Sequence, residues 1–284
     1  MTIGSEVRPV AVIGATGQQG GATVDALLKS GVKVRAAVRD PEASKAVALA
    51  DRGVELAKVD LSSSDSVRAL FDGASAAFAM TTMTGPDGVD GEVFHGRVIA
   101  RAAEQAHLPF LVYSSVGGVE RDSGVPHFES KNRVEQYLRD AIPVAFVRPT
   151  WFMENLPGKL ELGDVGVRLV LPLREDLSLQ MVTVRTIGSV AAAFLMNPPE
   201  SGSAIEIAGD DLTGEQMAAR LTERLGVPTT FVRQPVGDVT DEDQAAMWRW
   251  LNDPPAYQAD IEATRKLDPD AEDLAQWLAR QDLG

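Results

Sequence analysis

The chain of 284 residues contains no cysteine and only three histidines, and aromatic residues make up just 6% of it. Without cysteine it forms no disulfide and has neither a thiol nucleophile nor a thiolate metal ligand. The histidines, His95, His107 and His127, stand in unrelated contexts without metal-ligand spacing, so we predict no metal site. No apolar run reaches the length of a membrane-spanning helix.

Basic residues are scarce as well: 27 Lys and Arg stand against 41 Asp and Glu, a formal net charge of −14. Binding to nucleic acid needs clustered Lys and Arg to neutralise phosphates, so direct contact with DNA or RNA is not expected. The first nine residues lack the basic and apolar regions of a signal peptide. We therefore expect a cytoplasmic globular protein with no membrane contact.

One short segment carries the strongest functional signal. Residues 10–21, Val-Ala-Val-Ile-Gly-Ala-Thr-Gly-Gln-Gln-Gly-Gly, join an apolar run to three glycines spaced three apart, and a helix-forming stretch, Ala22 to Lys29, follows. Gly14 permits a tight turn, Gly17 lets backbone N–H groups approach a pyrophosphate, and Gly20 allows close helix packing. A strand, a glycine turn and a helix in this order predict a nucleotide-binding corner.

Strand-like and helix-like segments alternate through the first half. The expected strands are Val10–Ile13, Val32–Val38, Val54–Val59, Ala76–Met80, Phe110–Ser114 and Val144–Val147. This alternation predicts an α/β fold with a doubly wound parallel sheet of the Rossmann type, whose dinucleotide-binding body spans residues 1–150. Residues 151–284 are expected to form mostly a smaller α+β lobe for a substrate or partner, with some segments returning to the sheet. Asp40 and Pro41 predict a helix start, and Thr213 predicts a helix N-cap.

The end of the second expected strand distinguishes the two nicotinamide cofactors. An acidic side chain there binds the ribose 2′-hydroxyl, whereas an arginine accommodates a 2′-phosphate. Arg39 stands at this position, about twenty residues beyond the glycines. We therefore favour NADP(H) over NAD(H); the alternative is that Arg39 is an ordinary exposed strand-end residue.

Two further strand ends are expected to face the cofactor. Asp60 could accept a hydrogen bond from the adenine amino group while Leu61 covers one ring face, or Asp60 could cap the next helix. Met80, Thr81 and Thr82 end the fourth strand, where the threonines could equally be turn formers.

His127 and Lys131 are four residues apart on an expected helix and so share one face. Lys131 could hydrogen-bond the nicotinamide ribose and His127 could donate a proton, or both could lie on a solvated surface. After the sixth strand, Phe152, Met153, Glu154 and Asn155 place two polar side chains in an apolar turn. A carboxamide-bearing cofactor or backbone capping would supply their partners.

With these motifs in view, the chain resembles the NmrA-like family of atypical short-chain dehydrogenase/reductases over nearly its full length. The resemblance rests on Gly14-Ala-Thr-Gly-Gln-Gln-Gly-Gly21, Val38-Arg-Asp-Pro41, His127-Phe-Glu-Ser-Lys131, Phe152-Met-Glu-Asn-Leu156, Met247-Trp-Arg-Trp250 and Gln276-Trp-Leu278. It implies that NADP(H) is bound by Gly14, Thr16, Gly17, Gln18, Gln19, Arg39, Asp60, Leu61, Met80, Thr81, Thr82, Lys131, Phe152, Met153, Glu154 and Asn155.

The resemblance also implies two possible functions. Some members of the family reduce quinones, dyes or phenolic compounds, and others act as redox sensors without known turnover. Standard short-chain dehydrogenases use a Tyr-x-x-x-Lys pair, but His127 stands at the tyrosine position here. We predict an NADPH-dependent oxidoreductase of a small apolar carbonyl, quinone or enone, with Lys131 and His127 as catalytic residues. The alternative is a redox sensor that acts through a protein partner, and the sequence leaves a homodimer open.

Overall fold

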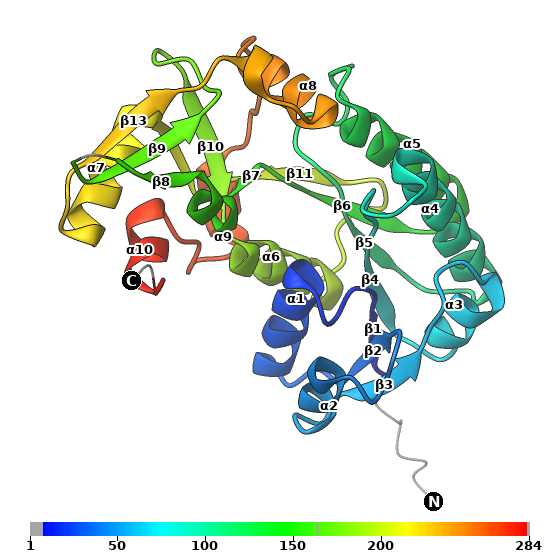
Figure 1. Cartoon of the computed structure of the whole chain (residues 1–284). Coiled ribbons are helices and arrows are strands. Elements are labelled where there is room, and N and C mark those ends of the chain that lie inside the picture. Colours follow the sequence, from blue (N-terminus) through cyan, green and yellow to red (C-terminus); the bar gives the residue numbers. More distant parts are fainter. Residues whose placement is uncertain (1–7, 164, 283–284) are drawn as a thin grey trace, which may run out of the picture. The chain divides into compact units, whose positions relative to one another are not determined.

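The structure is a computed structural model that describes residues 8–163 and 165–282, and it divides into two units (Figure 1). Unit 1 takes the described residues through Ser115, together with Ser130–Val147 and Ile187–Ala204. Unit 2 takes Val116–Glu129, Arg148–Thr186 and the described residues from Ile205 onward. No helix in these ranges combines the length and the apolar character needed to cross a membrane.

The central sheet has seven strands in the order β11-β6-β5-β4-β1-β2-β3. All pairings from β6 through β3 are parallel, which confirms the doubly wound α/β fold. Because β1 pairs with both β4 and β2, the strand order reverses at β1, the point where such sheets open a ligand crevice at the strands' carboxyl ends. The strands are β1 (Val10–Val12), β2 (Val34–Val38), β3 (Glu55–Lys58), β4 (Ala76–Met80), β5 (Leu111–Ser114), β6 (Val144–Pro149) and β11 (Ala204–Ile207).

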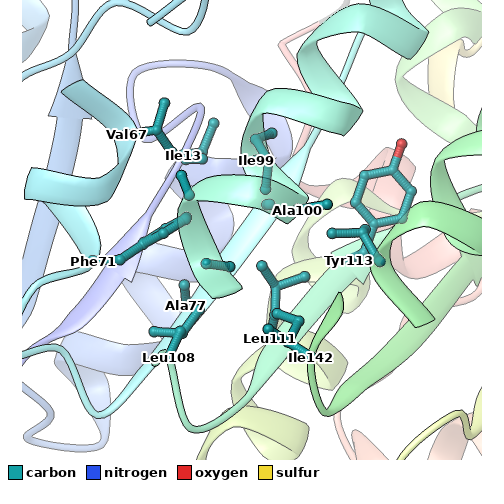
Figure 2. Packing of buried hydrophobic residues seen from close by; sticks show 14 of the residues in the cluster. Ile13, Val67, Phe71, Ala77, Ile99, Ala100, Leu108, Leu111, Tyr113 and Ile142 are labelled. Atoms are coloured by element: carbon teal, nitrogen blue, oxygen red, sulfur yellow. The ribbon is translucent and has the colours of Figure 1, made fainter. Parts of the chain in front are cut away.

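Helices cover both faces of this sheet (Figure 1). On one face lie α1 (Gln18–Lys29) and α6 (Val184–Met196), which touch so closely that a Cβ on Gly188 would lie 2.4 Å from the backbone of Ala22. On the other face lie α3 (Ser64–Phe71), α4 (Gly88–Gln105) and α5 (Pro126–Ala141). Figure 2 shows part of the apolar core of this unit, which includes Ile13, Phe71 and Leu111, with the Tyr113 ring at its side and the Tyr113 hydroxyl directed away from the other labelled residues.

The helix expected at Asp40 begins later, and that prediction was wrong by several residues. Helix α2 runs over Ser44–Ala50, and the side chain of Asp40 accepts a hydrogen bond from the backbone N–H of Glu42 at 3.0 Å. The carboxylate therefore closes a short turn before the helix, a local bond that Asp side chains make as readily as an N-cap.

Unit 2 contains two three-stranded sheets, β12-β10-β7 and β13-β9-β8. Helix α7 begins with the predicted Thr213 N-cap, which forms a reciprocal capping box with Gln216. Trp248 and Trp277 are fully buried in the apolar core of this unit. Its remaining elements are β7 (Trp151–Phe152), η1 (Met153–Lys159), β8 (Leu160–Leu162), β9 (Val167–Leu171), β10 (Ser178–Val182), β12 (Asp210–Thr213), α7 (Gly214–Leu225), β13 (Thr229–Arg233), η2 (Val236–Asp238), α8 (Glu242–Leu251), α9 (Ile261–Leu267) and α10 (Leu274–Ala279).

Candidate functional site

The glycine corner lies in unit 1, where β1 passes into α1. Gly14 has a φ of +78°, and its carbonyl accepts a hydrogen bond from the N–H of Gly17 at 2.9 Å. Gly17 is the N-cap of α1 and supplies no side-chain acceptor, so the first backbone N–H groups of the helix are left for another partner. An uncapped helix N-terminus behind a glycine turn is suited to an anion such as phosphate.

A cavity of about 390 Å³ lies at this corner. The structure gathers here nine of the residues predicted to bind the cofactor: Gly14, Thr16, Gly17, Gln18, Gln19, Arg39, Leu61, Met80 and Thr82. Sequence reasoning did not assign the other lining residues, Ile13, Gly20, Ala37, Val38 and Val59, to the site. These five residues lie next to predicted residues in the sequence. Extending the predicted site by one or two positions at each strand end and along the glycine turn would have included them.

Arg39 stands at the mouth of this cavity, directly after β2. Its side chain is exposed, and within the described part of the chain its guanidinium makes no ion pair or hydrogen bond. Arg35, four residues earlier, is instead committed to Glu55 at 2.7 Å. Arg39 is therefore the arginine at this strand end whose charge is available to a ligand.

Asp60 is placed differently from its neighbour Leu61. Leu61 lines the cavity, but Asp60 is exposed and its carboxylate accepts hydrogen bonds from the backbone N–H and the hydroxyl of Ser62, at 2.9 and 2.7 Å. These bonds lower the pKa of Asp60 below its ordinary value. In this structure Asp60 closes the turn before α3, whose N-cap is Ser63, and its contact with adenine stays a prediction.

The three consecutive residues at the end of β4 do not all face the cavity. Met80 and Thr82 line the cavity, whereas the hydroxyl of Thr81 lies 2.6 Å from that of Tyr113 and donates to Glu92 Oε1 at 3.0 Å. Lys131 reaches the same place from α5: its Nζ donates to the carbonyl of Thr81 at 3.0 Å and to Glu92 Oε1 at 2.9 Å. Lys131 is therefore held beside the cavity residues and is not an ordinary solvated lysine.

The Glu92–Lys131 pair is buried and charged. Burial by itself pushes the pKa of Glu92 up, but the Lys131 ammonium and hydrogen bonds from Ser130, Lys131 and Thr81 outweigh it and lower that pKa. Burial pushes the pKa of Lys131 down, yet Tyr113 and Glu92 outweigh it and leave that pKa raised. Both groups are ionised at neutral pH.

Sequence reasoning missed Glu92, although its position carried a signal. Glu92, Gly96, Ile99 and Ala103 recur at helical spacing and are all buried on α4, so a carboxylate occupies the apolar stripe of this helix. A buried carboxylate needs a cationic or hydrogen-bonding partner, so the sequence could have flagged Glu92 as a residue with a partner but not which residue that partner is.

His127 belongs to unit 2, whereas Lys131 belongs to unit 1, although both are part of α5. Its Nδ1 lies 2.7 Å from Oδ2 of Asp243 on α8, and its backbone N–H donates to Oδ1 of the same residue at 3.0 Å. The ring packs edge-on against Phe128 with 4.6 Å between centroids. Burial pushes the pKa of Asp243 up, but its bonds with His127 outweigh burial and lower it. One carboxylate therefore holds both the backbone and the ring of His127.

The segment after β6 provides one polar side chain with a structural partner. Glu154 Oε1 accepts a hydrogen bond from the backbone N–H of Val184 at 3.0 Å, at the start of α6, and burial raises the pKa of this carboxyl. Met153 is buried in the apolar core, Phe152 is half-buried and Asn155 is exposed. Backbone capping is thus the role the structure gives Glu154, and cofactor contact by this segment stays a prediction.

Comparison with known proteins agrees with this architecture. The model of the NmrA-like family matches residues 7–275. The chain is a member of the NmrA-like family. It is similar to an NAD(P)H azoreductase of Xenophilus azovorans, 28% identical over 225 residues that cover 78% of this chain and 76% of that protein. The NmrA-like oxidoreductases of two fungi that it also matches are aligned over only 47% of their length.

Solved structures share the fold of this chain over nearly its full length. An NADPH-dependent quinone oxidoreductase of Escherichia coli, solved with NADPH, has a TM-score of 0.81 at 23% identity and covers 95% of this chain and 98% of that one. NmrA, a negative transcriptional regulator solved with NAD, has a TM-score of 0.82 at 21% identity and covers 97% and 95%. These likenesses confirm the Rossmann-type fold predicted for the chain.

Proposed function

We propose that this NmrA-like protein binds NADPH at the glycine corner and uses it to reduce a small apolar quinone, carbonyl or enone. The observation that carries the proposal is the cavity itself, which joins an uncapped helix N-terminus to an exposed, uncommitted Arg39. The azoreductase and the quinone oxidoreductase among its relatives support a reductase of conjugated acceptors.

The residues present fit this cofactor. The N–H groups at the start of α1 would hold the pyrophosphate. Arg39 would pair with the 2′-phosphate, because its planar guanidinium can donate two parallel hydrogen bonds to one phosphate. Lys131 would donate to the hydroxyls of the nicotinamide ribose.

The chemistry divides between cofactor and protein. The bound dinucleotide supplies a hydride, which brings both electrons to the acceptor. Reduction of a quinone to a hydroquinone then needs one proton, and His127 supplies it as the general acid. Asp243 holds the Nδ1 side of that ring, so the proton leaves from Nε2. Solvent returns the proton to the imidazole after each turnover.

Oxidation of NADPH, followed by its absorbance over a panel of quinones, enones, aldehydes and azo dyes, tests the proposal. We expect turnover with at least one apolar acceptor. His127→Gln should lower kcat by about a hundredfold and leave the Kd for NADPH unchanged, since general acid catalysis contributes on that scale. His107→Gln is the matched control and should leave both values unchanged.

A non-catalytic redox sensor is the second candidate. The observation in its favour is that His127 occupies the place where standard short-chain dehydrogenases carry their tyrosine. NADPH binding without turnover on any acceptor would establish this candidate and refute the reductase.

A further inference from the structure

We propose that Glu92 is the positioning residue for Lys131 in the nucleotide site. The inference rests on the proposed NADPH site and adds to it a residue that the binding motifs do not contain. Glu92 lies on α4, and only 1% of its surface is exposed. It would touch no part of the cofactor and would act through Lys131 alone.

The contacts of Glu92 leave its carboxylate fully engaged. Oε1 accepts hydrogen bonds from the Thr81 hydroxyl at 3.0 Å and from Lys131 Nζ at 2.9 Å, and Oε2 accepts one from the Ser130 hydroxyl. The donors come from the end of β4 and from α5, so the carboxylate joins three elements at one point. A buried carboxylate with such partners stays where it is, because every displacement would leave charge unpaired.

Lys131 receives its position from this anchor. Its flexible four-carbon stem allows many rotamers, but Glu92 Oε1 and the Thr81 carbonyl fix Nζ from two sides. The Thr81 carbonyl lies between Met80 and Thr82, which both line the nucleotide cavity. The ammonium is therefore held against the backbone segment that carries these two lining residues before any ligand arrives, and a pre-positioned donor loses little conformational entropy on binding.

The alternative is that Glu92 only ties α4 to β4 and α5. That role would change stability but not the affinity for NADPH. Glu135 supplies the matched control, because it is a second glutamate of unit 1 that is 1% exposed and pairs with an arginine, Arg139, at 3.0 Å. It does not line the nucleotide cavity.

The test measures the Kd for NADPH by quenching of tryptophan fluorescence, together with thermal unfolding, in Glu92→Gln, Lys131→Met, the double variant and Glu135→Gln. We expect Glu92→Gln to raise Kd about tenfold, because a displaced ammonium loses a charge-assisted hydrogen bond to the ribose. The double variant should bind no more weakly than Lys131→Met, since Glu92 acts through that lysine. Glu135→Gln should leave Kd unchanged whatever its effect on unfolding.

A wild-type Kd in Glu92→Gln, or a double variant whose loss is the product of the single losses, would overturn the inference. If Glu92→Gln does not fold, Ser130→Ala replaces it: loss of the bond to Oε2 should raise Kd about twofold to threefold, and an unchanged Kd refutes the proposal. These outcomes are separate from the reductase proposal. Failure of every acceptor to oxidise NADPH would refute turnover and leave the binding result standing.

Discussion

Replacement of Gly20 by alanine isolates the geometry of the glycine corner. A Cβ at this position would lie 2.2 Å from the Gly14 carbonyl oxygen, 2.4 Å from its carbon and 2.8 Å from the nitrogen of Ala15. All three atoms are backbone and cannot rotate away as a side chain could. Real Cβ contacts are essentially never shorter than 3.0 Å, so α1 and the turn must separate by about 0.8 Å.

The magnitude follows from two opposing effects. Alanine in a helix gains about 1 kcal/mol over glycine, but overpacking against rigid atoms costs about 1–3 kcal/mol and more when backbone must move. We expect Gly20→Ala to lower the free energy of unfolding by about 2 kcal/mol. The displaced N–H groups of α1 should also weaken NADPH binding by about tenfold to a hundredfold, since hydrogen bonds to charged groups are worth about 1.5–3 kcal/mol.

The assay combines urea denaturation with titration of NADPH, and Gly21→Ala is the control. Its Cβ would lie 3.4 Å from the Ala15 carbonyl oxygen, an ordinary contact, so this variant should be as stable as the wild type or more stable and bind NADPH normally. If Gly20→Ala matched Gly21→Ala in both measurements, the close approach of α1 to the turn would not be what the corner requires.

Two further predictions concern single side chains. Arg39→Gln should raise the Kd for NADPH by tenfold or more and leave the Kd for NADH unchanged, because only the 2′-phosphate meets the guanidinium; an equal effect on both, measured by fluorescence titration, would remove its assigned role. Glu154→Gln should be more stable than the wild type at neutral pH. Burial raises the pKa of Glu154 above its ordinary 4.5, so the wild type loses stability as the pH rises through that raised value. The advantage should vanish below pH 4.5 in urea denaturation, and an advantage independent of pH would contradict the reasoning.

Features that depend on neighbouring residues could be predicted from the sequence. The strand, the glycine turn and the helix lie within about twenty residues, so backbone sterics dictate their arrangement wherever they occur. The position of Arg39 could be predicted because it is the residue directly after β2. The cap of α7 could be predicted because Thr213 bonds to Gln216, only three positions away. The start of α2 was misplaced because the Asp40 side chain can close a turn or cap a helix, and the local sequence allows both.

The pairing of distant side chains was decided by the tertiary structure. Glu92 meets Lys131 from 39 residues away, and Asp243 meets His127 from 116. Helix packing brings these groups together, and nothing in the local sequence of either partner specifies the other. The sequence alone determined the fold, the glycine corner and the arginine at its edge. Only the tertiary structure showed that the lysine and histidine of α5 are each held by a carboxylate, the buried one of Glu92 and the half-buried one of Asp243. Burial creates the need for a partner, and packing decides which one is near.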